Sequence, residues 1–120
     1  MSEFAISTQE QPPAWIVKLD GFLDAHTAPQ LEKTFQEMLD SGRYNIIVDF
    51  KKLHYISSAG LGVFMAFIED VRQNSGDIKL AGMTPKVFNV FDLLGFPMLY
   101  EIYDDLDQAH HKFSESPADS

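Results

Sequence analysis

The sequence of 120 residues contains no cysteine, so disulfide bonds and thiolate metal sites are excluded. It also lacks any run approaching the roughly 20 apolar residues that a membrane span needs. Residues 1–6 lack the basic and long apolar regions of a secretion signal. The four histidines show no recognised ligand spacing. We therefore expect a cytoplasmic protein that is not inserted in a membrane and holds no metal or cofactor.

Basic residues are scarce. Lys+Arg total 9 against 18 for Asp+Glu, which gives a formal net charge of -9 at pH 7. Such a charge repels phosphate backbones and anionic lipids, so nucleic acids and membrane surfaces are poor candidate partners. We attribute the acidity first to solubility and second to steering toward a basic partner surface.

Strand-like and helix-like patterns alternate along the chain. Strands are expected over residues 4–8, 14–20, 44–50, 77–81 and 100–102, the first at an edge. Helices are expected from Thr27 to Gly42, over 58–74, over 84–95 and over 104–113. This order predicts an open α/β sheet in one domain over residues 1–113, followed by a flexible tail over 114–120.

The apolar stripes of the expected helices predict the core. They include Met38, Met65, Val90 and Leu94. Core is also the preferred assignment for Phe88, Phe96 and Met98. An exposed Phe88 would suit a binding face.

One edge of the sheet is the place to look for function. Loops that leave the carboxyl ends of parallel strands share an edge, so residues 20–26, 51–58 and 82–85 are expected to meet there. On the first of these loops, Asp24 either caps the helix at Thr27 or lies close to Ser58. In the second case its carboxylate could orient the serine hydroxyl for phosphoryl transfer or repel the phosphate afterwards.

The segment Ile56-Ser-Ser-Ala-Gly-Leu-Gly-Val63 lies between a strand and a helix. Ser58 falls at the N-cap or in the first turn, where free backbone N–H groups could hold a phosphate. Gly60 and Gly62 disfavour a helix by roughly 1 kcal/mol each, which indicates close approach by the sheet or by another protein. Simple capping is the plainer explanation of Ser57 and Ser58.

Enzymatic explanations of this segment fail. A nucleophile elbow needs Gly-x-Ser-x-Gly, and Ile56 stands where the first glycine would be. A dinucleotide site needs a third glycine after Gly60 and Gly62. We therefore predict no catalytic residue.

Three blocks of the sequence resemble the STAS family, and more narrowly the bacterial anti-sigma factor antagonists. They are residues 19–29, 46–50 and 55–61, in the family's order and at its spacing. The likeness covers about residues 14–113. It implies a single STAS-like domain with a mixed sheet of four to five strands and helices packed mainly on one face.

The resemblance also implies a phosphorylation-switched binding module that is not an enzyme. The family's phosphorylated serine falls on Ser58, with Ser57 as second choice. The implied partners are an anti-sigma factor that is also a serine protein kinase, sequestered while Ser58 is unphosphorylated, and a PP2C-like phosphatase that resets the switch. The residues implied to surround the phosphosite and contact the partner are Asp24, Ser57, Ala59, Gly60, Leu61 and Gly62.

Two other interpretations stay open. The chain could be a constitutive STAS subunit of a lipid-transport or stressosome-like assembly, because many antagonists carry Asp before the phosphoserine and Ser or Thr after it, where this chain has Ser57 and Ala59. It could also bind a nucleotide or small anion at the Ser58 helix end. The absence of a P-loop lysine beside the glycines counts against that last interpretation.

Overall fold

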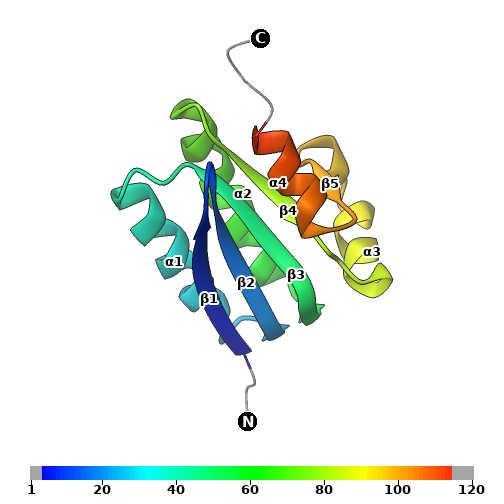
Figure 1. The fold of residues 1–120 in the computed structure, drawn as a ribbon. Coiled ribbons are helices and arrows are strands. Elements are labelled where there is room, and N and C mark those ends of the chain that lie inside the picture. Colours follow the sequence, from blue (N-terminus) through cyan, green and yellow to red (C-terminus); the bar gives the residue numbers. More distant parts are fainter. Residues whose placement is uncertain (1–3, 115–120) are drawn as a thin grey trace.

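A five-stranded sheet forms the centre of the computed structural model, which describes residues 4–114 (Figure 1). The strands lie in chain order; β1 is antiparallel to β2 and the other neighbours are parallel. The mixed sheet expected from the sequence is confirmed. The elements are β1 (Phe4–Gln11), β2 (Ala14–Leu23), α1 (Ala28–Asp40), β3 (Asn45–Ile56), α2 (Ser58–Gln73), β4 (Asp77–Ala81), α3 (Pro85–Leu93), the 3₁₀ turn η1 (Phe96–Met98), β5 (Ile102–Tyr103) and α4 (Leu106–Ser114).

The two faces of the sheet carry different helices. Val17 belongs to the larger core, which packs under α1, α2 and α3, whereas its neighbour Ile16 belongs to a small cluster with Ala109 of α4. Successive side chains of a strand point to opposite faces, which explains this division. Three helices therefore cover one face and α4 alone covers the other, as Figure 1 shows.

Aromatic rings join the helices of the larger core. Phe64 of α2 is fully buried, with its ring centroid 5.6 Å from that of Phe35 in α1, 5.8 Å from Phe50 in β3 and 6.0 Å from Phe91 in α3. The Tyr100 hydroxyl donates a hydrogen bond of 2.5 Å to the Phe64 carbonyl oxygen, and burial raises the pKa of that hydroxyl. α2 is thus the helix on which the other elements of this face pack.

Several boundaries and core assignments need correction. β2 and β3 run on to Leu23 and Ile56, past the polar residues at which the sequence pattern ended them, because pairing between the two strands continues there. The last strand and helix begin about two residues later than expected. Ser114 closes α4 instead of opening a tail, and the rest of the expected tail, 115–120, lies outside the described residues.

Three methionine and leucine side chains assigned to the core are exposed. Met65 is 48% exposed because it lies on the outer face of α2, and Leu94 lies outside because α3 ends at Leu93. Met98 points outward from η1. Phe96 and Met38 are buried as expected, whereas Val90 and Phe88 are half-buried.

Phe64 and Met65 offer a direct test of this core, because they are neighbours in α2 with opposite exposure. Phe64→Ala removes a ring packed against rings of α1, β3 and α3 and should lower the free energy of unfolding by about 3–5 kcal/mol. Met65→Ala should cost less than about 1 kcal/mol. Urea denaturation followed by circular dichroism measures both, and equal losses would contradict the assigned burial.

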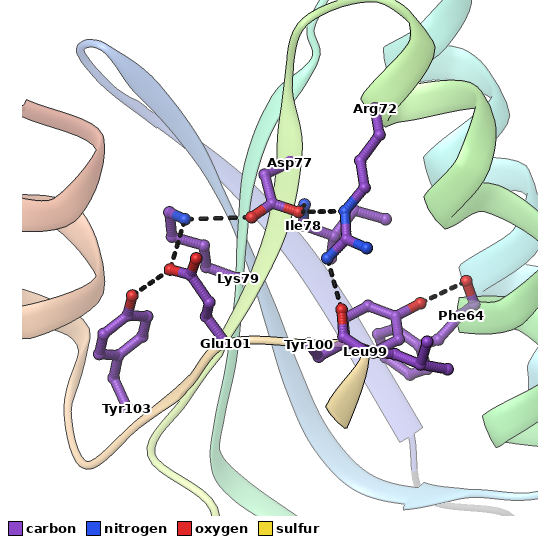
Figure 2. A network of polar contacts seen from close by, with 9 residues as sticks. All are labelled: Phe64, Arg72, Asp77, Ile78, Lys79, Leu99, Tyr100, Glu101 and Tyr103. Atoms are coloured by element: carbon purple, nitrogen blue, oxygen red, sulfur yellow. Dashed lines mark hydrogen bonds and ion pairs between the residues drawn. The ribbon is translucent and has the colours of Figure 1, made fainter. Parts of the chain in front are cut away.

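A charged network ties α2 to the edge of the sheet (Figure 2). Asp77, the first residue of β4, accepts a hydrogen bond from Arg72 Nε at 3.0 Å and one from Lys79 Nζ at 3.1 Å. Lys79 is buried and also donates to Glu101 at 2.8 Å, and the Tyr103 hydroxyl donates to the same carboxylate. A buried ammonium group needs such partners to offset its lost hydration.

Glu101 makes the stability of this network depend on pH. The hydrogen bond from Lys79, helped by that from Tyr103, lowers the pKa of the Glu101 carboxyl below its ordinary value. A carboxyl with a lowered pKa stabilises the fold above its unfolded-state pKa, about 4.3, and this contribution is lost as the pH falls through the folded-state value. Glu101→Gln should therefore be less stable than the wild type at pH 7, and the difference should shrink as the pH falls below about 4.3. Melting temperatures across that range would contradict the assignment if the difference stayed constant.

Candidate functional site

The site begins where β2 and β3 end together. Leu23 and Ile56 are register partners, and the Ser57 N–H donates to the Leu23 carbonyl oxygen at 2.9 Å. The loop that carries Asp24 therefore starts beside Ser57, the residue directly before α2. The structure brings these two sequence-predicted loops together.

The third predicted loop does not join them. The last residue of β4, Ala81, pairs with Asp49 of β3, and a Cβ placed on Gly82 would be 3.2 Å from the Asp49 carboxylate. β3 then continues to Ile56 beyond the end of β4. Residues 82–85 consequently follow β3 at mid-length, where Gly82 lies against Lys51 at the start of the predicted 51–58 loop and not beside Ser57 at its end, because β4 is much shorter than β3.

The two adjacent serines have different environments. Ser57 is the N-cap of α2, in extended backbone conformation, and its Oγ accepts a hydrogen bond of 3.4 Å from the Gly60 N–H. Ser58 is the first residue of α2 and is exposed. Among residues 4–114 its side chain has no hydrogen-bond partner. The capping role is filled by Ser57, which leaves the Ser58 hydroxyl accessible at the positive end of the helix dipole.

The two glycines of the first turns also differ. A Cβ on Gly60 would be 2.8 Å from Leu23 Cγ and 3.0 Å from Ile56 Cγ1, so the sheet is what approaches this residue closely. Gly62 has nothing within 4 Å of the same position and is exposed. Gly62 therefore leaves a flat, open patch on the outer side of α2.

Asp24 holds the loop before α1. Its Oδ1 accepts hydrogen bonds from the His26 N–H at 2.9 Å and the Thr27 N–H at 3.2 Å. Thr27 occupies the N-cap position, but its hydroxyl donates to the Phe22 carbonyl oxygen at 2.9 Å and caps no helix N–H. The Asp24 carboxylate thus fixes the shape of the loop that lies beside Ser57.

Exposure divides the predicted contact residues. Ala59 and Gly62 are exposed beside Ser58, and we call these three residues the Ser58 surface. Asp24 and Ser57 are half-buried. Gly60 and Leu61 are buried, so they hold α2 against the sheet and offer no side-chain surface of their own.

An exposed aromatic cluster at the same end of the sheet escaped the sequence analysis. The Phe22 ring lies 6.3 Å from that of His54 and 6.4 Å from that of Tyr55, centroid to centroid. Phe22 is 48% and Tyr55 44% exposed. Phe22 faces outward by the regular alternation of β2, and the register shift that skips His54 leaves both His54 and Tyr55 exposed on β3. The signal for this cluster in the sequence is the polar and aromatic run directly before Ile56, which the local pattern assigns to a loop.

The chemistry of this end is that of a contact surface. Among residues 4–114 no group of three His, Cys, Asp or Glu side chains could hold a metal ion. Nor does any helix in that range have the length and apolarity to cross a membrane. The end presents the accessible Ser58 hydroxyl, small neutral residues and aromatic rings, which suit a closely packed protein interface.

Comparisons with known proteins agree with this description. The STAS domain family model matches residues 5–109. An anti-sigma-B factor antagonist of Staphylococcus aureus is 29% identical over 97 residues, covering 81% of this chain and 90% of the relative. The putative anti-sigma factor antagonist BtrV of Bordetella bronchiseptica is 32% identical over 98 residues, covering 82% and 84%. An anti-sigma factor antagonist from Mycobacterium paratuberculosis has the same fold, with a TM-score of 0.85 at 20% identity, covering 92% of this chain and 93% of that one.

Single substitutions should separate the structural serine from the accessible one. Ser57→Ala removes the N-cap bond and should lower the free energy of unfolding by about 0.5–2 kcal/mol. Ser58→Ala breaks no contact and should change it by less than about 0.5 kcal/mol. Chemical denaturation of both variants tests this, and a larger loss for Ser58→Ala would reverse the two assignments.

Proposed function

Because the chain belongs to the STAS domain family, we propose that it is an anti-sigma factor antagonist whose binding is switched by phosphorylation of Ser58. Unphosphorylated, it sequesters an anti-sigma factor that is also its serine protein kinase; phosphorylated, it releases that factor. The names of the S. aureus and B. bronchiseptica relatives support the antagonist role. In this function the chain acts by binding, and the phosphoryl chemistry belongs to its partners.

The observation that carries the proposal is the free hydroxyl of Ser58. A kinase needs a hydroxyl that it can reach, and this one is exposed at the first residue of α2 without an intramolecular partner among the described residues. Ser57 supplies the cap, so modification of Ser58 does not have to break the start of the helix. The fold can therefore remain intact in both states.

Electrostatics explains how a phosphate would release the partner. Phosphorylation adds roughly -1.5 to -2 charges at pH 7 to a surface of neutral residues, Ala59 and Gly62. Burying that charge against a partner costs hydration free energy. In the free protein the helix N-terminus and water both solvate the phosphate. The phosphate thus favours the free state, and each 1.4 kcal/mol of difference weakens binding tenfold.

Asp24 has a supporting role in this switch. Its carboxylate is held in the loop beside Ser57 by the His26 and Thr27 N–H groups. We assign it two effects, a fixed loop shape for the partner to recognise and a negative charge that opposes a phosphate on Ser58. A PP2C-like phosphatase would restore the unphosphorylated hydroxyl.

Phosphorylation can be tested with purified components. The chain should be incubated with ATP and the candidate anti-sigma kinase encoded in the same genome, and the modified residue located by mass spectrometry. We expect phosphate on Ser58 in the wild type and in Ser57→Ala, none in Ser58→Ala, and at least tenfold weaker binding of the kinase after modification. Binding is measured by isothermal titration calorimetry.

Two results would contradict the switch. Phosphate on Ser57 would contradict the assignment of Ser58 as the switch, and the absence of phosphate on either serine would favour a constitutive subunit of a STAS-containing assembly. A rise in melting temperature on adding ATP or GTP alone would instead favour the nucleotide-binding interpretation, since a ligand of the native state stabilises it.

A further inference from the structure

A cluster of exposed apolar side chains lies at the end of α3 and around η1, away from the Ser58 surface. Leu93 is 85% exposed and Met98 is 89% exposed, and Leu94 and Leu99 beside them are also exposed. A single exposed leucine is common in soluble proteins, but a group of large apolar residues on one surface indicates an interaction site. We call these four residues the apolar ridge.

The apolar ridge is held by buried anchors on both sides. The rings of Phe96 and Tyr100 are buried and stacked with centroids 5.6 Å apart, and Phe96 packs edge-on against Phe91 at 5.2 Å. The Tyr100 hydroxyl and the Arg72 guanidinium join this segment to α2, the latter by a bond of 2.5 Å to the Leu99 carbonyl oxygen (Figure 2). Two aromatic residues therefore point inward from the same short turn that presents the ridge outward.

A line along α2 connects the apolar ridge with the Ser58 surface. Ser58, Met65 and Arg72 follow one another at intervals of seven residues, which places them on nearly the same side of a helix. Met65 is half-exposed, and Arg72 reaches Leu99. The two heptads from Ser58 to Arg72 span about 21 Å, a distance that one partner with an interface of standard size can cover.

We infer that the apolar ridge is a second docking surface for the anti-sigma factor of the proposed function, on which this inference rests, and that it enters an apolar groove bordered by basic side chains. The ridge itself carries no charge, while Asp92, directly before Leu93, is exposed beside it. The nearby cation, Arg72, is already bound to Asp77. Charge complementarity therefore favours lysine and arginine at the rim of the partner's groove.

The same charges argue against other occupants. A second copy of this chain would bring another net charge of -9 and the same acidic rim into the contact. An anionic lipid surface is repelled for the same reason. An apolar groove on a protein would pack against the apolar ridge, and basic residues at its rim would complement the acidic border of the ridge.

The ridge would divide the binding surface into a part that phosphorylation of Ser58 affects and a part that it does not. It is uncharged and lies beyond Met65 along α2, so a phosphate on Ser58 does not alter its contacts. The phosphorylated protein should consequently retain weak affinity for the anti-sigma factor through the ridge. Phosphorylation would then weaken the complex without abolishing it. The fraction of anti-sigma factor that is released would depend on the concentrations of the two proteins.

The test uses the anti-sigma factor shown to bind in the phosphorylation experiment. Leu93→Ser combined with Met98→Ser should weaken its binding to the unmodified chain at least tenfold and should remove the residual binding of Ser58→Asp. The matched control, Leu93→Met with Met98→Leu, keeps an apolar surface and should bind like the wild type. Both side chains are almost fully exposed, so melting temperatures should be unchanged in both double variants.

Each alternative result has a separate meaning. If Ser58→Asp weakens binding but the serine double variant binds like the wild type, the ridge inference is wrong and the switch stands. If sedimentation shows a wild-type dimer that only the serine variant abolishes, the occupant is a second copy and the inference is wrong. If the wild type binds no anti-sigma factor, the proposed function and the ridge inference both fall.

Discussion

The parallel pairing of β2 with β3 extends to Leu23 and Ile56, and the arrangement of the site depends on it. The hydrogen bond from the Ser57 N–H to the Leu23 carbonyl oxygen continues this pairing into the start of α2. Gly60 then allows the helix to lie against both strand ends at a distance that a Cβ would prevent. The direction of α2, and with it the position of the Ser58 hydroxyl, follows from these contacts.

α2 serves stability and recognition with different residues of the same turns. Phe64 packs against rings from α1, β3 and α3, while Met65 beside it faces outward. Ser57 caps the helix, while Ser58 stays accessible. Because the two roles fall on different side chains, the surface residues can change with little cost to folding.

The sequence predicted the fold better than the surface. Alternating strands and helices, the helix start at Thr84 and the stop at Gly42 are local signals, and the structure has the elements that they indicate. The sequence pattern did not predict the full lengths of β2 and β3, because the pairing between these strands continues beyond polar residues such as Asp20 and Lys52. The exposure of Met65 and Met98 depends on how the helices pack in the tertiary structure, and local sequence patterns do not contain that information. That Ser57 caps α2 and leaves Ser58 free is likewise a matter of geometry.

The two ends of the described chain lie at opposite ends of the sheet (Figure 1). Phe4 opens β1 opposite Gly21, close to the ends of β2 and β3 that carry the site. α4 instead lies near the β1–β2 turn, where His110 Nε2 is 2.8 Å from the Pro12 carbonyl oxygen. A fluorophore or surface tether attached after α4 would therefore leave the Ser58 end facing solution, whereas one attached before β1 would stand where a partner approaches. Comparing partner binding to the protein immobilised through one end or the other would therefore show whether the partner approaches the Ser58 end of the sheet.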